Sequence, residues 1–247
     1  MELIRRMMGL VVALSMVCGL GCVPDGCSVL VESEYEVEDV VVALAGNHDS
    51  TLEASRSATF RITSTRMNGK AVGTATLFKY RGEQIVMTAA HVVRNALSLS
   101  MESRYQPGLE HELTVIYYDD ISDIAILTTS SEIRGIKPIK LRAAGERHLG
   151  AGTKTIYSGY PNNHSLLTIH GRISGYTPDA NLILDTYGWS GASGSAVFDE
   201  KGRLLGILSA MDIGHGLFGQ PELIPDVIIV IPATKIDFGV LDLLLGK

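Results

Sequence analysis

The stretch GWSGASGSAVF, residues 188–198, places two serines, Ser190 and Ser193, among three glycines. Glycine adopts backbone conformations that few other residues tolerate, so the chain can turn here and direct neighbouring N–H groups at one point. Two such groups, those of Gly191 and Ser193, would form an oxyanion hole, where removal of one donor typically slows catalysis by roughly 10²–10³-fold. A plain glycine–serine turn has the same composition, so this stretch alone leaves both interpretations open.

A serine hydroxyl becomes a nucleophile when an imidazole accepts its proton and a carboxylate orients that imidazole. Two other stretches supply these groups. His91 follows the apolar strand in QIVMTAAHVV, residues 84–93, and Asp123 directly precedes the apolar run IAIL. A carboxylate drawn toward the interior needs a partner, which a histidine N–H provides. Serine-protease chemistry requires His91, Asp123 and a serine of residues 188–198 to converge as a catalytic triad, although His91 taken alone also fits an ordinary core or surface histidine.

The composition favours a β-rich body. The chain has 247 residues, is 46% hydrophobic and contains 26 glycines, which suits one domain, or one domain of two similar halves, built from short strands and tight turns. Short apolar segments at close spacing favour barrels or sandwiches over a βαβ sheet. They form a first series (58–63, 73–80, 84–88, 112–118 and 124–128) and a second (155–158, 166–174, 182–185, 195–198, 204–209 and 227–231).

Residues 232–245 change character and predict a closing helix. Pro232 suits the first helical position, and a 3.6-residue period puts four apolar residues on one face. These are Ile236, Val240, Leu243 and Leu244.

Charge and cysteine content exclude several classes of partner. The net charge is −6 and no run is rich in Lys or Arg, so we predict no nucleic-acid partner and no polybasic membrane contact. All three cysteines, Cys18, Cys22 and Cys27, precede the body of the chain. The body therefore uses neither a disulfide nor a cysteine-ligated metal, and we expect no metal or organic cofactor. A Cys22–Cys27 disulfide and two free thiols both remain open.

Residues 1–22 have the pattern of a targeting segment. A short basic region, an apolar run and two small residues precede a cysteine: Arg5 and Arg6, residues 7–17, Gly19 and Gly21, and Cys22. The pattern predicts either signal cleavage or lipidation of Cys22, and hence an exported protein that is periplasmic, extracellular or tethered to a membrane as a lipoprotein. An uncleaved anchor helix is the alternative, although the run from Met7 to Val23 is at the short limit for a span, which usually takes about 20 apolar residues. Residues 23–55 are acidic and predict a linker or an extra strand.

Three stretches, TAAHV at 88–92, SDIAIL at 122–127 and GASGSAVF at 191–198, occur in an order that resembles the trypsin-fold serine proteases. The resemblance is closest to the bacterial HtrA/DegP branch and covers nearly all of residues 57–240. SGYP at 158–161, TIHGRISG at 168–175 and the hairpin FDEKGRLLGI at 198–207 extend it.

Spacing within the resemblance selects the nucleophile. Gly202 and Gly206 stand nine and thirteen residues after Ser193, where the family has them, so Ser193 is chosen over Ser190.

The resemblance implies an all-β protease domain at residues 56–247. Its expected parts are two antiparallel six-stranded β-barrels, at 57–142 and 150–231, and a short C-terminal helix at 232–246. The implied activity is that of a serine endopeptidase acting on protein or peptide substrates. His91 and Asp123 would come from the first barrel, and Ser193 and Gly191 from the second. The family's PDZ domain is not expected, because the chain ends at Lys247.

This sequence departs from the family pattern at two positions. Ser195 stands where glycine is usual, which bears on the local loop geometry. Ala192 replaces an aspartate that pairs with a newly cut N-terminus in digestive members, so we expect no activation by that route.

The resemblance places the substrate pocket at five residues: Tyr187, Trp189, Ser209, Ala210 and Met211. No carboxylate stands at the position that selects Lys or Arg, and Met211 narrows the pocket toward small or medium apolar side chains.

Two other functions share some of these sequence features. A lipase-like α/β-hydrolase has Ser193, Asp212 and His215 in the right order, but its glycine two residues after the serine and its alternating helices are missing. A trypsin-fold module that binds without turnover remains open, because sequence alone does not show that the triad meets.

Overall fold

The computed structural model describes residues 50–215 and 221–247. The predicted signal segment 1–22 and residues 23–49 of the predicted acidic segment lie outside the described residues. Within the described part of the chain, no helix is both long and apolar enough to span a bilayer.

The first barrel is a ring of six antiparallel strands, because β1 pairs with both β4 and β2. Around the ring the order is β1-β4-β5-β6-β3-β2, and the two-residue β7 adds to β2 in parallel. Strand residues alternate between the two faces of the sheet, so alternate apolar residues such as Phe60 and Ile62 fill the interior. The strands are β1 (Thr59–Arg66), β2 (Gly69–Tyr80), β3 (Glu83–Thr88), β4 (Ser98–Glu102), β5 (Glu110–Asp119), β6 (Ile124–Thr129) and β7 (Ile139–Lys140).

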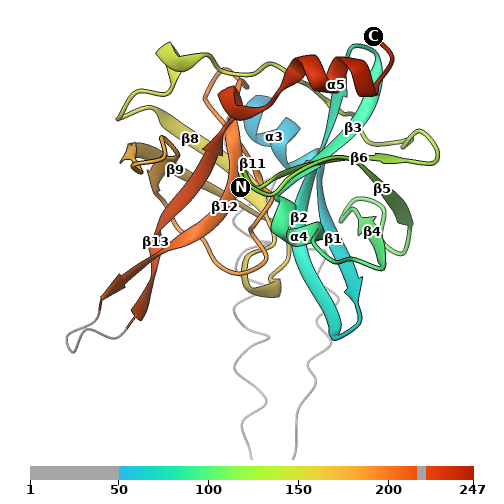
Figure 1. The fold of residues 1–247 in the computed structure, drawn as a ribbon, viewed down its shortest axis with the longest axis horizontal. Helices are drawn as coiled ribbons and strands as arrows, with labels where there is room; N and C mark the ends of the chain where they lie inside the picture. Colours follow the sequence, from blue (N-terminus) through green and yellow to red (C-terminus); the bar gives the residue numbers. More distant parts are fainter. Residues whose placement is uncertain (1–49, 216–220) are drawn as a thin grey trace, which may run out of the picture. The chain divides into compact units, whose positions relative to one another are not determined.

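The second barrel is also closed, in the order β10-β13-β12-β11-β8-β9. Figure 1 shows the long β12–β13 ribbon extending away from the barrel. The strands are β8 (Lys154–Gly159), β9 (Leu167–Tyr176), β10 (Leu182–Asp185), β11 (Ala196–Phe198), β12 (Leu204–His215) and β13 (Pro221–Pro232). The prediction of an all-β fold with two antiparallel six-stranded barrels and a short C-terminal helix is confirmed.

A third apolar cluster joins the barrels. Leu77 points into the first barrel, so its neighbour Phe78 points outward, toward the second barrel. There it packs against Phe198, and the centroids of the two rings lie 6.0 Å apart. The cluster also holds Ile85, Met87, Ile124 and Ile126 from the first barrel, Ala196, Leu204, Ile207 and Ile231 from the second, and Ala233, Ile236 and Leu241 from the C-terminal segment. Apolar burial therefore fixes the barrels against each other.

The helices are short. They are α3 (Ser50–Ser57), α4 (Ala90–Val93) and α5 (Phe238–Leu244), with 3₁₀ turns at Glu146–His148, Pro161–Asn163 and Ala233–Lys235.

Residues 50–55 were predicted as linker or extra strand, which is wrong, because they lie in α3. The stretch STLEASRS carries an acidic residue in its first turn and a basic one in its last, which favours a helix. The buried Ser55 hydroxyl donates to the Ser158 hydroxyl at 2.9 Å and attaches α3 to the second barrel.

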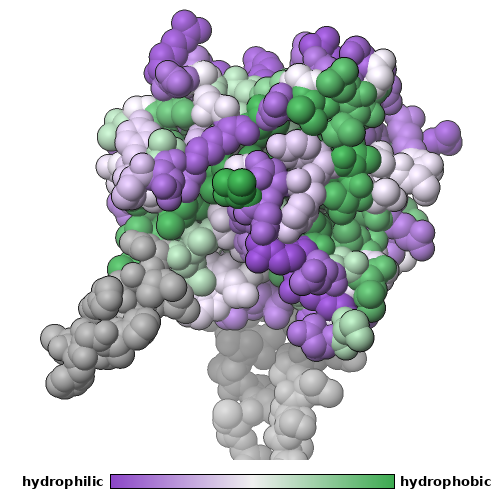
Figure 2. Space-filling model, viewed as in Figure 1, coloured by the Kyte–Doolittle hydropathy of each residue, from purple (hydrophilic) through white to green (hydrophobic). Residues whose placement is uncertain are grey.

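The closing helix is shorter than predicted, and its predicted apolar face is wrong. Ile236 is extended, and Asp237 caps the helix by accepting the N–H of Val240 at 3.0 Å. This late start turns Leu241 inward and leaves Leu243 79% exposed. Figure 2 shows hydrophobic surface in the region where α5 lies in Figure 1.

Truncating the aromatic contact between the barrels tests this packing. Phe78→Ala should lower the free energy of unfolding by roughly 3–5 kcal/mol, because Phe78 is fully buried. Leu97→Ala is the control; Leu97 is 70% exposed, and a change within about 0.5 kcal/mol is expected. Urea titration measures both, and a Phe78→Ala loss below about 1 kcal/mol would contradict the packing.

Candidate active site

Asp123 holds His91 by two hydrogen bonds. His91 lies in α4, directly after β3, and Asp123 lies in the turn before β6. Asp123 Oδ2 is 2.8 Å from His91 Nδ1, and Asp123 Oδ1 accepts the backbone N–H of His91 at 2.8 Å. A carboxylate accepts hydrogen bonds, so this contact places the ring proton on Nδ1 and leaves Nε2 as a proton acceptor.

The environment of Asp123 keeps the carboxyl ionised. Burial alone would raise the pKa of Asp123, but hydrogen bonds from the His91 ring, the Ser209 hydroxyl and the His91 backbone outweigh burial and lower it. The negative charge is thus available to stabilise a protonated His91.

Ser209 connects the two barrels at this site. Its hydroxyl donates to Asp123 Oδ2, and its carbonyl oxygen accepts the Ser193 hydroxyl at 3.3 Å. Ser209 therefore contacts Asp123 and Ser193, and His91 is connected to it through Asp123. Ser209 is one of the predicted pocket residues, and its hydroxyl has in addition this contact with Asp123.

Arg66 supports His91 from the β1–β2 hairpin and was missed in the sequence analysis. Its guanidinium donates to the carbonyl oxygens of His91 and Val92 at 2.9 and 3.0 Å. An arginine 25 residues before the histidine carries no local sequence signal, because only the pairing of β1 and β2 brings it there.

The loop around Ser193 has its peptide groups fixed by specific partners. The carbonyl of Ser190 accepts the N–H of Asn162 at 2.6 Å, and that of Ala192 accepts the N–H of Ser195 at 3.0 Å. A trans peptide is planar, with its N–H opposite its C=O, so these bonds turn the N–H groups of Gly191 and Ser193 the other way. Among the described residues, neither N–H has a protein acceptor.

Gly191 is required for the shape of this loop. Its φ is +98°, and a Cβ there would lie 2.4 Å from the carbonyl oxygen of Tyr160.

A family model described as a trypsin-like peptidase domain matches residues 73–207, which is more than half of the chain. This chain belongs to the trypsin-like peptidase family. No curated protein matches it.

Several solved structures share the fold, an HtrA-type protease among them. The serine endoprotease from Yersinia pestis is 18% identical with a TM-score of 0.62, over 82% of this chain and 68% of that one. The HtrA-type protease AlgW with tripeptide is 18% identical with a TM-score of 0.64, over 81% and 65%. Rv3671c from M. tuberculosis H37Rv, in an inactive mutant form, is 20% identical with a TM-score of 0.59, over 81% and 92%. The chain thus spans about two thirds of the length of the first two.

Within this trypsin-like peptidase, the unusual Ser195 fits its loop. The Ser195 hydroxyl is buried and donates to the carbonyl of Ala192 at 2.7 Å, beside the bond from its own N–H. Space for it comes from Gly159, where a Cβ would lie 2.3 Å from the hydroxyl oxygen. The serine therefore adds a second donor to the peptide that carries the Ser193 N–H.

The other predicted pocket residues have mixed environments. Tyr187 is 38% exposed, and its carbonyl accepts the hydroxyl of Tyr157. Trp189 is half-buried, Ala210 is exposed, and Met211 packs against the core of the second barrel.

Ile228 was missed as a neighbour of the predicted pocket. A Cβ on Gly188 would lie 2.5 Å from Ile228 Cγ2, so the fully buried Ile228 packs directly against the backbone between Tyr187 and Trp189.

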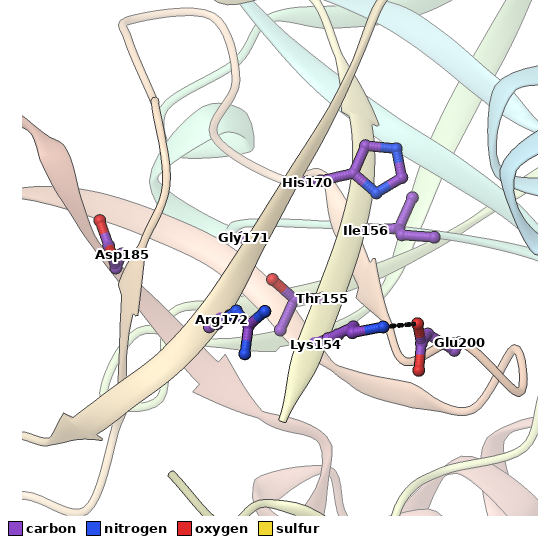
Figure 3. Close-up of a pocket in the computed structure, with 8 residues that line it drawn as sticks. All are labelled: Lys154, Thr155, Ile156, His170, Gly171, Arg172, Asp185 and Glu200. Atoms are coloured by element: carbon purple, nitrogen blue, oxygen red, sulfur yellow. Dashed lines mark hydrogen bonds and ion pairs between the residues drawn. The ribbon is translucent and has the colours of Figure 1, made fainter. Parts of the chain in front are cut away.

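A separate cavity of about 380 Å³ lies at β8 and β9, and none of the predicted site residues lines it. Figure 3 shows Lys154 paired with Glu200 at one side of it, with His170 and Arg172 on the neighbouring strand. Among the described residues, no group of three His, Cys, Asp or Glu side chains could hold a metal ion.

The Gly159–Ser195 contact predicts a compensating pair of substitutions. Gly159→Ala should cost roughly 1–3 kcal/mol of stability by overpacking, and Ser195→Ala about 1 kcal/mol through the lost hydrogen bond. The double variant should lose less than the sum, because removal of the hydroxyl frees the space that the new methyl needs. Unfolding free energies from urea titration test this; additive losses would show that the two positions do not meet.

The lowered pKa of Asp123 predicts a pH dependence of stability. The folded pKa lies below the ordinary value near 3.8, so ionised Asp123 stabilises the fold above that value. This contribution is lost as the pH falls below about 3.8 through the folded pKa. As the pH falls from about 5 to about 2, the free energy of unfolding of Asp123→Asn should therefore decrease by less than that of the unmodified protein. Leu97→Ala, an exposed change that removes no titratable group, should keep the original slope, and equal slopes for all three proteins would contradict the prediction.

Proposed function

We propose that the protein is a serine endopeptidase that hydrolyses peptide bonds through an acyl-enzyme intermediate. The observation that carries the proposal is the chain of contacts from His91 to Asp123, from Asp123 to Ser209, and from Ser209 to Ser193. The N–H groups of Gly191 and Ser193, for which residues 50–215 and 221–247 supply no acceptor, support the same assignment.

In the proposed mechanism, the Ser193 hydroxyl turns from the Ser209 carbonyl to His91 Nε2 when substrate binds. Hydrogen bonds of catalytic groups are often long before substrate arrives. Ser193 Oγ attacks the scissile carbonyl while Nε2 takes its proton, and the N–H groups of Gly191 and Ser193 stabilise the oxyanion. His91 then protonates the leaving amine, and Asp123 stabilises the transient imidazolium.

Water completes the cycle. His91 takes a proton from water as the water oxygen attacks the acyl carbonyl. The second tetrahedral intermediate collapses by breaking the bond to Ser193 Oγ, and His91 returns the proton to that oxygen as the carboxylic acid product leaves. The mechanism uses no metal or organic cofactor.

We propose that activity does not depend on a new N-terminus. The side chain of Ala192, the residue before the nucleophile, is buried and apolar and has no charge to pair with an ammonium group. The enzyme should therefore cleave peptides while residues 24–55 remain attached.

We propose that the residue before the scissile bond is small or medium-sized and apolar. Ile228 against Gly188 and the half-buried Met211 support a shallow apolar pocket. Faster cleavage after Arg than after Val or Ala would overturn this specificity.

Export remains a proposal from the sequence of residues 1–22. Cleavage or lipidation at Cys22 would place the enzyme outside the cytoplasm, with membrane attachment through this segment alone.

A fluorophosphonate probe tests the proposed nucleophile. The native protein should gain one probe mass, located on Ser193 by peptide mass spectrometry, because the probe reacts with a serine that His91 activates. Ser193→Ala should abolish the label, and Ser190→Ala, a matched change in the same loop, should retain it. Failure of the native protein to react, or a label on Ser190, would contradict the proposal and favour a trypsin-fold binding module.

A further inference from the structure

Thr74, in β2 of the first barrel, lies fully buried against the loop that carries Ser193. Its hydroxyl donates to the carbonyl oxygen of Gly191 at 2.7 Å and accepts the N–H of Tyr160 at 3.1 Å. A hydroxyl has one proton to donate, so the direction of both bonds is set. One side chain of the first barrel thus connects two loops of the second.

The backbone of Thr74 holds the same loop. Its N–H donates to the carbonyl oxygen of Ser193 at 2.8 Å, and its own carbonyl accepts the Thr88 hydroxyl at 2.7 Å. A Cβ on Gly194, whose φ is +91°, would lie 2.1 Å from the Thr74 carbonyl oxygen. The loop is therefore in close contact with Thr74 and cannot shift toward it.

These bonds fix the two residues that matter most in the proposed mechanism. The proposed oxyanion donors are the N–H groups of Gly191 and Ser193, and the carbonyls of both residues accept hydrogen bonds from Thr74. Glycine has more backbone freedom than any other residue, so Gly191 needs an external partner to hold one conformation.

We propose that Thr74 is a positioning residue for the oxyanion loop: its buried hydroxyl holds the Gly191–Ala192 peptide, which lies between the two peptides that carry the proposed donors, and so keeps the loop in the shape that presents the Gly191 and Ser193 N–H groups to the substrate. The inference rests on the proposed function. Loss of the hydroxyl leaves the Gly191 carbonyl and the Tyr160 N–H buried without this partner, which favours another orientation of the loop.

Thr76 supplies a matched control. It lies two residues further along β2, is also buried, and its hydroxyl also accepts an N–H from the second barrel, that of Ala196 at 3.4 Å. It contacts β11 rather than the oxyanion loop. Thr76→Ala therefore removes an equivalent bond between the barrels without touching the proposed donors.

The experiment compares Thr74→Ala, Thr74→Ser and Thr76→Ala with the unmodified protein on one peptide substrate. Thr74→Ala should lower kcat by roughly 10–10²-fold with little change in KM, because the loop acts on the transition state. Its affinity for a peptide boronate, which forms a tetrahedral adduct, should fall in parallel. Thr74→Ser keeps the hydroxyl and should restore most of kcat, and Thr76→Ala should keep kcat despite its lower stability.

Three outcomes would overturn the inference. Thr74→Ala could retain kcat and boronate affinity, Thr74→Ser could be as impaired as Thr74→Ala, or Thr76→Ala could lose kcat to the same extent, which would indicate a merely structural role. If Thr74→Ala does not fold, Thr74→Cys, with its weak donor, replaces it.

A crystal structure of Thr74→Ala separates this inference from the proposed function. If the unmodified protein neither cleaves peptides nor takes the fluorophosphonate label, the proposed function fails, but the loop can still be inspected. A reoriented Gly191–Ala192 peptide, with the neighbouring Gly191 and Ser193 N–H groups displaced, supports the positioning role. An unchanged loop contradicts it.

Discussion

The candidate active site depends on a single carboxylate, that of Asp123. It accepts hydrogen bonds from the ring and the backbone of His91 in the first barrel and from the hydroxyl of Ser209 in the second. Burial disfavours a charge, so the carboxylate stays ionised because these donors surround it. The same contacts orient the imidazole and bring β12, with the Ser209 carbonyl that binds Ser193, to the junction of the barrels. The hydrogen bonds that keep the Asp123 carboxylate ionised therefore also fix the positions of His91 and Ser209.

Two kinds of interaction hold the barrels together. The apolar cluster around Phe78 and Phe198 supplies area, and apolar contact tolerates small displacements because it is non-directional. Hydrogen bonds require defined distances and angles, so the contacts of Thr74 and Ser209 fix the loops to a degree that packing does not. Phe78 and Phe198 therefore contribute mainly to stability, whereas Thr74 and Ser209, at the same junction, determine the geometry of the site.

The fold was predictable because its strands are short apolar segments between turn residues, and the resemblance supplied their arrangement as two barrels. The order of His91, Asp123 and Ser193 also led to a specific triad, and the structure contains the His91–Asp123 hydrogen bond that this triad requires. Contacts between distant strands were not predictable. The sequence places Ser209 in the pocket beside Ala210 and Met211. Its hydrogen bond to Asp123 was not predictable, because Asp123 lies 86 residues earlier in the chain. Thr74 and Arg66 likewise contact residues that are distant in the sequence, Gly191 and His91. The face of α5 was misjudged because the Asp237 cap, rather than the apolar period, sets where the helix begins.

The tautomer of His91 is the most direct measure of the central interaction. In protein labelled with ¹⁵N-histidine, at a pH where the ring is neutral, NMR assigns the proton to Nδ1 or Nε2. The account predicts the proton on Nδ1, facing Asp123, with Nε2 unprotonated, and a loss of this preference in Asp123→Asn. A His91 ring protonated on Nε2 in the unmodified protein would contradict it, because that nitrogen could not then accept the proton of Ser193.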